Sequence, residues 1–298
     1  MRVVAIVGAG RVGRALGRRL RELGWRIGPV ITQSEATARA AVRAIRGGQP
    51  HVGLTRQVLV ADLVLIAVPD RTLGEVAQEL ARIGGDEWRG KTVLHTSGAL
   101  DSSPLQPLEQ LGAATGSLHP LQTFTGKNVP VLEGVIFAVE GSRTALRTAR
   151  QVARALGGTA VQVKGRLKPA YHAAGAFVAG HALTLVEAGT RILVSLGFTR
   201  RQAARALLPL VRQVLRNFEL LGPGAAWTGP LARGDYETIA LHAAALEGFP
   251  VEYRQAYEAL SRLGARVLAR EPEQVLCDLG AVFAKARAAH ARGGGEKH

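Results

Sequence analysis

The sequence predicts a two-domain protein: an α/β domain built on a mostly parallel sheet, followed by an all-α domain. Its 298 residues suit about two ordinary domains. The first half alternates β-branched runs with helical patterns, which is typical of an open parallel sheet. Strand signals vanish after Lys164-Gly165. We therefore place the α/β domain at 1–164 and the helical domain at 165–292, and we expect a disordered tail at 293–298.

Hydrophobic periodicity and turn residues define the elements of the first half. The run 63–68 is continuously apolar, as expected of a strand buried on both faces, and Pro69 ends it. Ser34 is a helix-capping residue, and the stripe Val12, Leu16 and Leu20 marks a helix. We expect strands at 2–7, 26–32, 63–68, 92–96, 115–118, 135–139 and 159–163, and helices at 12–23, 34–46, 72–83 and 142–156.

The second half reads as helices separated by glycine and proline signals. Pro169 suits a first helical turn, Gly197 would end that helix, and Thr199 would cap the next. Pro209 predicts a kink inside the second helix, and Asp235 predicts a helix start. We expect helices at 169–196, 199–221, 235–247, 251–269 and 273–289, with a loop at 222–234.

Composition excludes several classes of protein. Apolar residues make up 47% and charged residues 20% of the chain, which excludes a disordered protein. The single cysteine, Cys277, forms no intramolecular disulfide and no thiolate metal cluster, so no metal site is expected. The N-terminal apolar run is short and ends at Gly8, unlike a signal peptide. We expect a cytoplasmic protein.

The net charge of +15 raises the question of nucleic-acid binding. The basic residues are mostly arginines scattered along helical stretches, and only 5% of residues are aromatic. This pattern favours solvated helix faces over a nucleic-acid site. The positive charge would still attract small molecules that carry phosphate or carboxylate groups.

An uncharged segment at 169–186 has the minimum length of a membrane span. Its content of alanine and glycine, with His172 and His181, favours instead a buried helix, either at the centre of the helical domain or in a dimer interface. Small residues such as Ala173 and Gly175 would allow two copies to approach closely. We therefore expect a homodimer formed through the helical domain, and no membrane contact.

The motif Gly8-Ala9-Gly10-Arg11-Val12-Gly13 has the pattern G-x-G-x-x-G. It follows a predicted strand and opens a predicted helix, the context in which this pattern binds a dinucleotide. Gly8 permits the turn, Gly10 leaves room for a pyrophosphate, and Gly13 lets the helix pack on the strand. Arg11 and Val12 lie at the helix N-terminus, whose free N–H groups bind anions. We expect a Rossmann-like domain.

The end of the second strand bears on the choice of nicotinamide cofactor. An acidic residue there would bind the ribose 2′-hydroxyl of NAD. The chain has Thr32-Gln33-Ser34 instead, and Ser34 would also serve as a helix cap. The Thr32 and Ser34 hydroxyls suit a 2′-phosphate, which Arg11 or Arg39 would neutralise. NADP is therefore expected, with NAD less favoured.

Polar groups follow three successive strands, and the carboxyl ends of parallel strands are where ligands bind. A histidine alone is more often structural than catalytic, but with two histidines at strand ends the two roles are equally expected. The segments expected to face a nicotinamide and its substrate are Val68-Pro69-Asp70, His95-Thr96-Ser97-Gly98, and Ser117 to Phe124 with His119.

Lys168 and His172 open the long helix and, four residues apart, share one of its faces. Such a pair would deliver a proton to a carbonyl oxygen or imine nitrogen in a cleft between the domains. Lys168, with a pKa lowered by burial, is the first choice of donor, and His172 is the second. His119 would orient the substrate. The alternative is a surface lysine beside a hydrogen-bonded histidine.

Five segments in order resemble a bacterial family of Rossmann-like proteins with a C-terminal domain of unknown function: Gly8–Gly13, 95–100, 116–124, 171–174 and 228–235. The resemblance implies an NADP-dependent oxidoreductase, similar in layout to pyrroline-5-carboxylate reductase and 6-phosphogluconate dehydrogenase, whose all-helical domain dimerises. In the hydroxyacid dehydrogenases of that group, an asparagine stands where this chain has His172. The family of Rossmann-like proteins with a C-terminal domain of unknown function often has an asparagine where this chain has Gly180.

The Ser-Leu-His-Pro segment is similar to Ser-His-Pro of prephenate dehydrogenases, which implies a substrate contact for His119. Hydride transfer between NADP(H) and a small carbonyl, imine or hydroxyl compound is the expected function. The alternative is a non-catalytic dinucleotide-binding sensor or scaffold. The sequence leaves open the roles of four further polar residues, Asn217, Arg233, Asp235 and His181.

Overall fold

The structure is a computed structural model that describes residues 3–293. Contacts divide it into two compact units, Met1–His181 and Ala182–His298, each described here by itself. The division falls inside α6 (Lys168–Ser195). The change from mixed to all-helical structure comes earlier, between the last strand, which ends at Gln162, and the start of α6.

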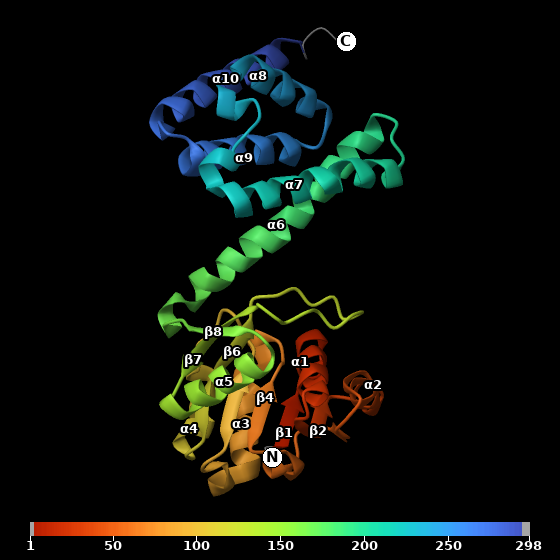
Figure 1. Ribbon diagram of the computed structural model, residues 1–298, viewed down its shortest axis with the longest axis vertical. Helices are drawn as coiled ribbons and strands as arrows, with labels where there is room; N and C mark the ends of the chain where they lie inside the picture. Colours follow the sequence, from red (N-terminus) through yellow and green to blue (C-terminus); the bar gives the residue numbers. More distant parts are fainter. Residues whose placement is uncertain (1–2, 294–298) are drawn as a thin grey trace. The chain divides into compact units, whose positions relative to one another are not determined.

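An eight-stranded sheet forms the centre of the first unit, in the order β3-β2-β1-β4-β5-β6-β7-β8 (Figure 1). All neighbouring strands are parallel except β6 and β7, which are antiparallel. The predicted Rossmann-like, mostly parallel sheet is therefore confirmed. The strands are β1 (Val3–Val7), β2 (Arg26–Thr32), β3 (Gln49–Val52), β4 (Leu63–Ile66), β5 (Thr92–His95), β6 (Ala114–Pro120), β7 (Ile136–Gly141) and β8 (Thr159–Gln162).

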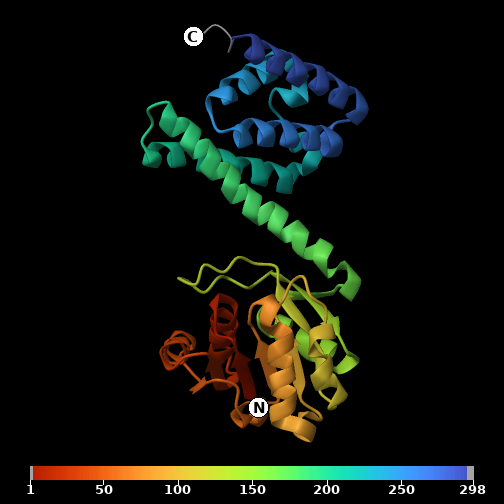
Figure 2. The ribbon, with the colours of Figure 1, turned by 180° about the vertical axis from the view of Figure 1, so that it is seen from behind.

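Helices cover both faces of this sheet (Figures 1 and 2). Side chains alternate along each strand, so that Ile6 joins the core under α1, α2 and α5, whereas Val7 joins the core under α3 and α4. Ser34 and Ser142 cap α2 and α5, each accepting a hydrogen bond from a backbone N–H three residues later. The helices are α1 (Arg11–Glu22), α2 (Glu35–Ile45), α3 (Leu73–Gly84), α4 (Gln106–Gln110) and α5 (Arg143–Ala155).

The second unit is helical, as predicted. Its core joins α8, α9 and α10 through small and aromatic side chains such as Ala265 and Phe283. Gly197 ends α6 with a φ of 95°, and Thr199 begins α7 with a full capping box. Besides the end of α6, the helices are α7 (Arg200–Ala226), α8 (Tyr236–Ala245), α9 (Val251–Leu268) and α10 (Pro272–Gly293).

One prediction for this half needs correction. In α7 the backbone leaves helical angles at Gly222, whose φ of 75° is open to glycine, while Pro209 lies inside the helix as predicted. The loop predicted at 222–234 is shorter, because a further helical turn runs to Ala226. Of the predicted tail, Gly293 belongs to α10, and 294–298 lie outside the described residues.

The predicted burial of the segment 169–186 is not found within the single chain. Along α6 only Lys168 and Thr190 are buried, and apolar side chains such as Val178 (68% exposed) and Leu183 (73%) face outward. Among the described helices, the stretch Gly165–Ser195 alone has the length and hydropathy to span a membrane, and 6% of its apolar 18-residue window is buried.

Candidate active site

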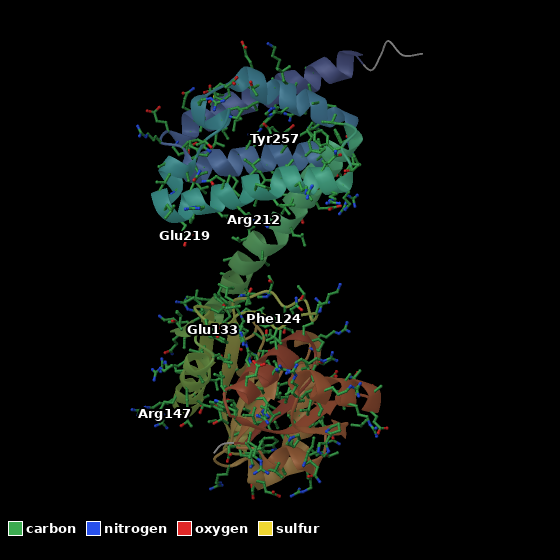
Figure 3. All side chains as sticks on the ribbon, turned by 45° about the vertical axis from the view of Figure 1, so that its right-hand side comes forward. Phe124, Glu133, Arg147, Arg212, Glu219 and Tyr257 are labelled. Atoms are coloured by element: carbon green, nitrogen blue, oxygen red, sulfur yellow. The ribbon has the colours of Figure 1, made fainter. Side chains whose placement is uncertain are left out.

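A cleft of about 470 Å³ lies at the carboxyl ends of β1, β4, β5 and β6. The strand order reverses between β1 and β4, the switch point at which open α/β sheets bind ligands. Phe124 closes one side, from the segment between β6 and β7 that passes over the sheet edge (Figure 3). The lining residues are Gly10, Arg11, Val12, Ala67, Val68, Pro69, Asp70, Thr96, Ser97, Gly98, His119, Pro120, Gln122, Phe124 and His172.

The three glycines of the motif have the environments that dinucleotide binding requires. Gly8 has a φ of 83°, and a Cβ there would lie 2.6 Å from Val68 Cγ1. A Cβ on Gly13 would lie 2.4 Å from the Gly8 carbonyl oxygen, so this glycine allows α1 to pack on the β1 turn. A Cβ on Gly10 would meet nothing within 4 Å. Gly10 therefore faces open space at the N-terminus of α1, where a pyrophosphate fits.

Three hydroxyl groups gather where β2 meets α2. Thr32 Oγ1 and Ser34 Oγ each lie 2.8 Å from Thr37 Oγ1. The capping role of Ser34 is confirmed, since its hydroxyl accepts from the Thr37 N–H. Arg39 pairs with Glu35 at 2.5 Å on the outer face of α2. Thr32 and Ser34 do not line the 470 Å³ cleft itself.

Lys168 is fully buried behind the cleft wall. Its Nζ donates to the Ser97 carbonyl oxygen at 3.0 Å and to Ser117 Oγ at 2.7 Å, and it does not line the cleft. Burial lowers the pKa of this amine to about 8, against the pull of nearby carboxylates, Glu140 first. The first turn of α6 is thus joined to β5 and β6 by a buried lysine.

His119 and His172 meet edge to face in the cleft, with ring centroids 5.6 Å apart. Gly98 makes room for both, since a Cβ there would lie 2.5 Å from His172 Cδ2 and 2.7 Å from His119 Nε2. Burial, with smaller effects from His172 and Lys168, lowers the pKa of His119 to about 4. The His119 imidazole is therefore neutral at pH 7.

His95 has a structural position at the end of β5. Its Nδ1 accepts from the Ser97 N–H at 3.2 Å, and its Nε2 lies 2.8 Å from the Asp101 carbonyl oxygen. Burial first, and then the Lys168 charge, lower the pKa of His95 to about 4. The loop after β5 is also bonded to the segment after β4, because Asp70 Oδ2 accepts a hydrogen bond from Ser97 Oγ at 2.8 Å.

The structure brings together most of the predicted site residues. Sequence reasoning named the segments that contain the cleft residues Asp70, Gly98, Gln122 and Phe124, and the polar partners Ser117 and Tyr171 behind them, but it assigned none of these residues an individual role. All but Tyr171 follow or end the strands already singled out, so their place next to them was the available signal. Nine of the predicted site residues line the cleft: Gly10, Arg11, Val12, Val68, Pro69, Thr96, Ser97, His119 and His172.

Two of the polar residues left open have local roles in the second unit. Asp235 caps α8 by accepting from the Thr238 N–H at 3.1 Å. Asn217 Oδ1 accepts from Gln213 Nε2 at 2.7 Å along α7. His181, at the end of the first unit, meets Phe177 edge to face at 5.1 Å.

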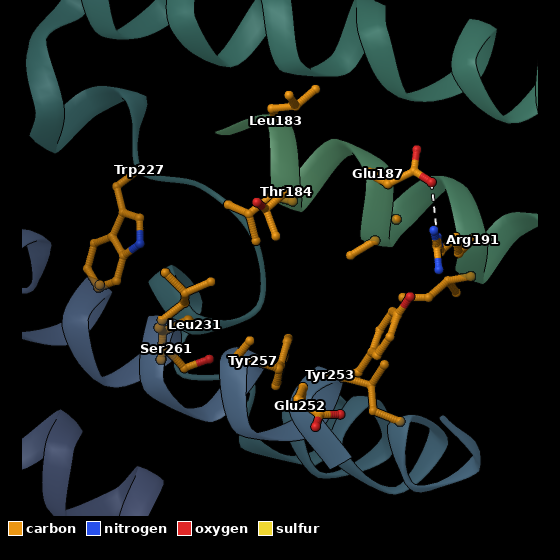
Figure 4. A pocket seen from close by; sticks show the side chains of 18 residues that line it. Leu183, Thr184, Glu187, Arg191, Trp227, Leu231, Glu252, Tyr253, Tyr257 and Ser261 are labelled. Carbon is orange, nitrogen blue, oxygen red and sulfur yellow. Dashed lines mark hydrogen bonds and ion pairs between the residues drawn. The ribbon is translucent and has the colours of Figure 1, made fainter. Parts of the chain in front are cut away.

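A larger apolar pocket, of about 850 Å³, lies in the second unit between α6 and α9 (Figure 4). Trp227, Tyr253 and Tyr257 line it, together with leucine side chains. Two of its charged lining residues pair with each other, with Arg191 Nε 3.0 Å from Glu187 Oε1. This pocket lacks the strand ends and glycine turn of the cleft in the first unit.

Comparison of the sequence with known families identifies both halves of the chain. A Rossmann-like domain matches residues 1–120, and a domain of unknown function, DUF2520, matches residues 135–263. The chain is thus a Rossmann-like protein with a C-terminal DUF2520 domain, as its motifs predict. No curated protein matches the chain.

Solved structures share the fold over most of the chain. A candidate NADP oxidoreductase of Bacteroides fragilis has 21% identity and a TM-score of 0.72, covering 88% of this chain and 96% of its own. An imine reductase of Streptomyces aurantiacus has 14% identity and a TM-score of 0.61, covering 92% of this chain and 98% of its own. A pyrroline carboxylate reductase of Plasmodium falciparum, solved with NADP bound, has 13% identity and a TM-score of 0.55, covering 97% of this chain and 99% of its own.

Proposed function

We propose that the protein is a reductase that binds a nicotinamide dinucleotide in the cleft of the first unit. The observation that carries the proposal is the position of two histidines in the same cleft as the glycine turn. The open space at Gly10 fits a pyrophosphate, held by the first N–H groups of α1. Structural neighbours whose names include NADP oxidoreductase and imine reductase support the same class.

NADP(H) is the preferred form of the cofactor in this proposal. In place of an acidic residue, the end of β2 carries Thr32 and Ser34, whose hydroxyls gather with that of Thr37. These groups suit a 2′-phosphate, and Arg11 at the first turn of α1 supplies a positive charge. Arg39 contributes less, because Glu35 already pairs with it.

The bound dinucleotide would supply a hydride, and the substrate would be a small compound with a carbonyl or imine group. Reduction of such a group leaves charge on oxygen or nitrogen, which needs a hydrogen-bond donor and a proton. His119 and His172 line the cleft and Lys168 does not. We therefore assign the proton to His172, the orientation of substrate to His119, and the bracing of the cleft wall to Lys168.

The test is NADPH oxidation, followed by absorbance, with a panel of keto acids, ketones and cyclic imines. We expect turnover with at least one imine or ketone, and its loss in Gly10→Val. Tight NADPH binding without oxidation across the panel would contradict a reductase and favour the alternative of a non-catalytic sensor.

We also propose that a second copy of the chain covers the exposed apolar side chains of α6. The start of this helix belongs to the cleft wall, where Lys168 is buried and Tyr171 hydrogen-bonds to His119. The uncharged segment of this helix, with its small residues, suits close packing against an identical helix. The exposed apolar side chains and small residues of α6 therefore favour a homodimer.

A further inference from the structure

A hydrogen bond joins His119 to Tyr171 at the edge of the cleft. Nδ1 of His119 lies 3.0 Å from the Tyr171 phenol oxygen, and the rings meet at 90°. His119 lines the cleft and Tyr171 does not. The other ring nitrogen, Nε2, lies next to Gly98, which is a cleft residue. Tyr171 therefore engages one nitrogen of the imidazole and leaves the other to the cleft.

The direction of this hydrogen bond follows from the surroundings of the phenol. Burial raises the pKa of Tyr171 to about 12, so the phenol keeps its proton at neutral pH. A phenol O–H is a stronger hydrogen-bond donor than an imidazole N–H, and an imidazole nitrogen is a stronger acceptor than a phenol oxygen. The hydroxyl proton is then available to His119. A neutral imidazole has one N–H and one acceptor nitrogen. With Nδ1 as the acceptor, the proton of His119 is on Nε2.

We propose that Tyr171 is a positioning residue that holds His119 in the Nε2–H tautomer, with this N–H directed into the cleft. The inference rests on the proposed reductase function, and it makes His119 a hydrogen-bond donor to the carbonyl oxygen or imine nitrogen of the substrate. It excludes His119 as the base that removes a proton from substrate. The groups around the ring are Tyr171, His172 and Lys168 on α6, and Gly98 after β5.

The tautomer is measurable without substrate or cofactor. Two-bond ¹⁵N–¹H spectra of the full chain labelled at histidine distinguish a protonated Nε2 from a protonated Nδ1. The signals of His119 are those missing from His119→Gln. We expect the proton on Nε2 in the wild type, and a mixture of both tautomers in Tyr171→Phe. A wild-type proton on Nδ1, or the same tautomer in both proteins, would overturn the proposal.

The chain contains a matched control in the second unit. His242 Nδ1 lies 2.9 Å from the Tyr257 phenol oxygen, with the rings at 83°. Tyr257→Phe removes an equivalent hydrogen bond there, and we expect the His119 signals to stay unchanged. If Tyr257→Phe alters the His119 signals as much as Tyr171→Phe does, the effect is not local and the proposal fails.

Turnover separates positioning from a purely structural role. With a substrate found in the NADPH assay, we expect Tyr171→Phe to lower kcat roughly tenfold, the worth of about one hydrogen bond, with unchanged affinity for NADPH. An unchanged kcat overturns the positioning role. If the wild type reduces no compound, the proposed reductase function fails, while the wild-type spectrum still decides the tautomer.

Discussion

The ammonium group of Lys168 lies 2.7 Å from the hydroxyl oxygen of Ser117, 51 residues earlier in the chain. Its second acceptor is the carbonyl oxygen of Ser97. The lysine is thus bonded to residues of two strand ends that border the cleft. Because the side chain is fully buried, these bonds replace those that the ammonium would make with water.

Lys168→Met should therefore act on stability. The substitution leaves the Ser97 carbonyl and the Ser117 hydroxyl buried without this donor, at a cost of about 1–3 kcal/mol for each unsatisfied group. Urea denaturation measures the change. Lys91→Met is a matched control, since Lys91 Nζ donates to the Leu59 and Ala61 carbonyls away from the cleft. A 10²–10⁴-fold loss of turnover with unchanged stability would instead identify Lys168 as the proton donor.

His172→Gln should lower turnover while the affinity for NADPH stays unchanged. The glutamine keeps a hydrogen-bonding group in the cleft but carries no transferable proton. The loss of a positioned acid typically costs about 10²–10⁴-fold in rate. Steady-state kinetics and a fluorescence titration of NADPH measure the two quantities. Turnover within a few-fold of wild type would remove His172 from the mechanism.

Stability should fall as the pH is lowered from about 6.5 to about 4. The pKa of His95 is about 4 in the folded chain against 6.5 in the unfolded chain, so only the unfolded chain takes up a proton in this range. The contribution of neutral His95 is present above pH 6.5 and is lost by pH 4, amounting to roughly 3 kcal/mol. Denaturation curves at several pH values measure it. His95→Gln should reduce the slope without removing it, because His119, whose pKa is also lowered to about 4, contributes over the same pH range. An equal slope in both proteins would refute this origin.

Val178→Lys should weaken the proposed homodimer. Val178 is 68% exposed in the single chain, and a lysine in an apolar interface would place an unpaired charge there. Light scattering should give a dimer mass for the wild type at micromolar concentration and a lower mass for the variant. Val267→Lys is the control, because Val267 on α9 is similarly exposed at 64%. A monomeric wild type would rule out the dimer.

Local signals in the sequence predict most of the fold. Ser34, Thr199 and Asp235 cap helices as expected, because capping depends on the next few residues only. The edge strand β3 was missed, since Gln49–Val52 contains a proline and lacks an apolar run. For α6 the sequence left open a place at the centre of the helical domain or in a dimer interface, because uncharged composition does not reveal whether the covering surface belongs to the same chain.

The candidate site was predictable to the extent that strand ends converge. The position of His119 at the end of β6 follows from the order of strands, and this placed it near Ser97. The bonds of Tyr171 to His119 and of Lys168 to Ser117 join residues more than 50 positions apart. Such pairs depend on how α6 packs against the sheet, for which the sequence carries no local signal.

The proposed binding of NADP(H) at the glycine turn depends on the open space beside Gly10. A Cβ added at Gly10 meets nothing within 4 Å, so Gly10→Val should fold normally while its methyl groups occupy the pyrophosphate space. Gly280→Val on α10, where a Cβ also meets nothing, is the control.

Calorimetric titration should show NADPH binding about ten- to hundredfold more tightly than NADH, from one charge-assisted phosphate contact. Binding should be lost in Gly10→Val and kept in Gly280→Val. Equal or tighter binding of NADH, or unchanged NADPH binding by Gly10→Val, would contradict the account.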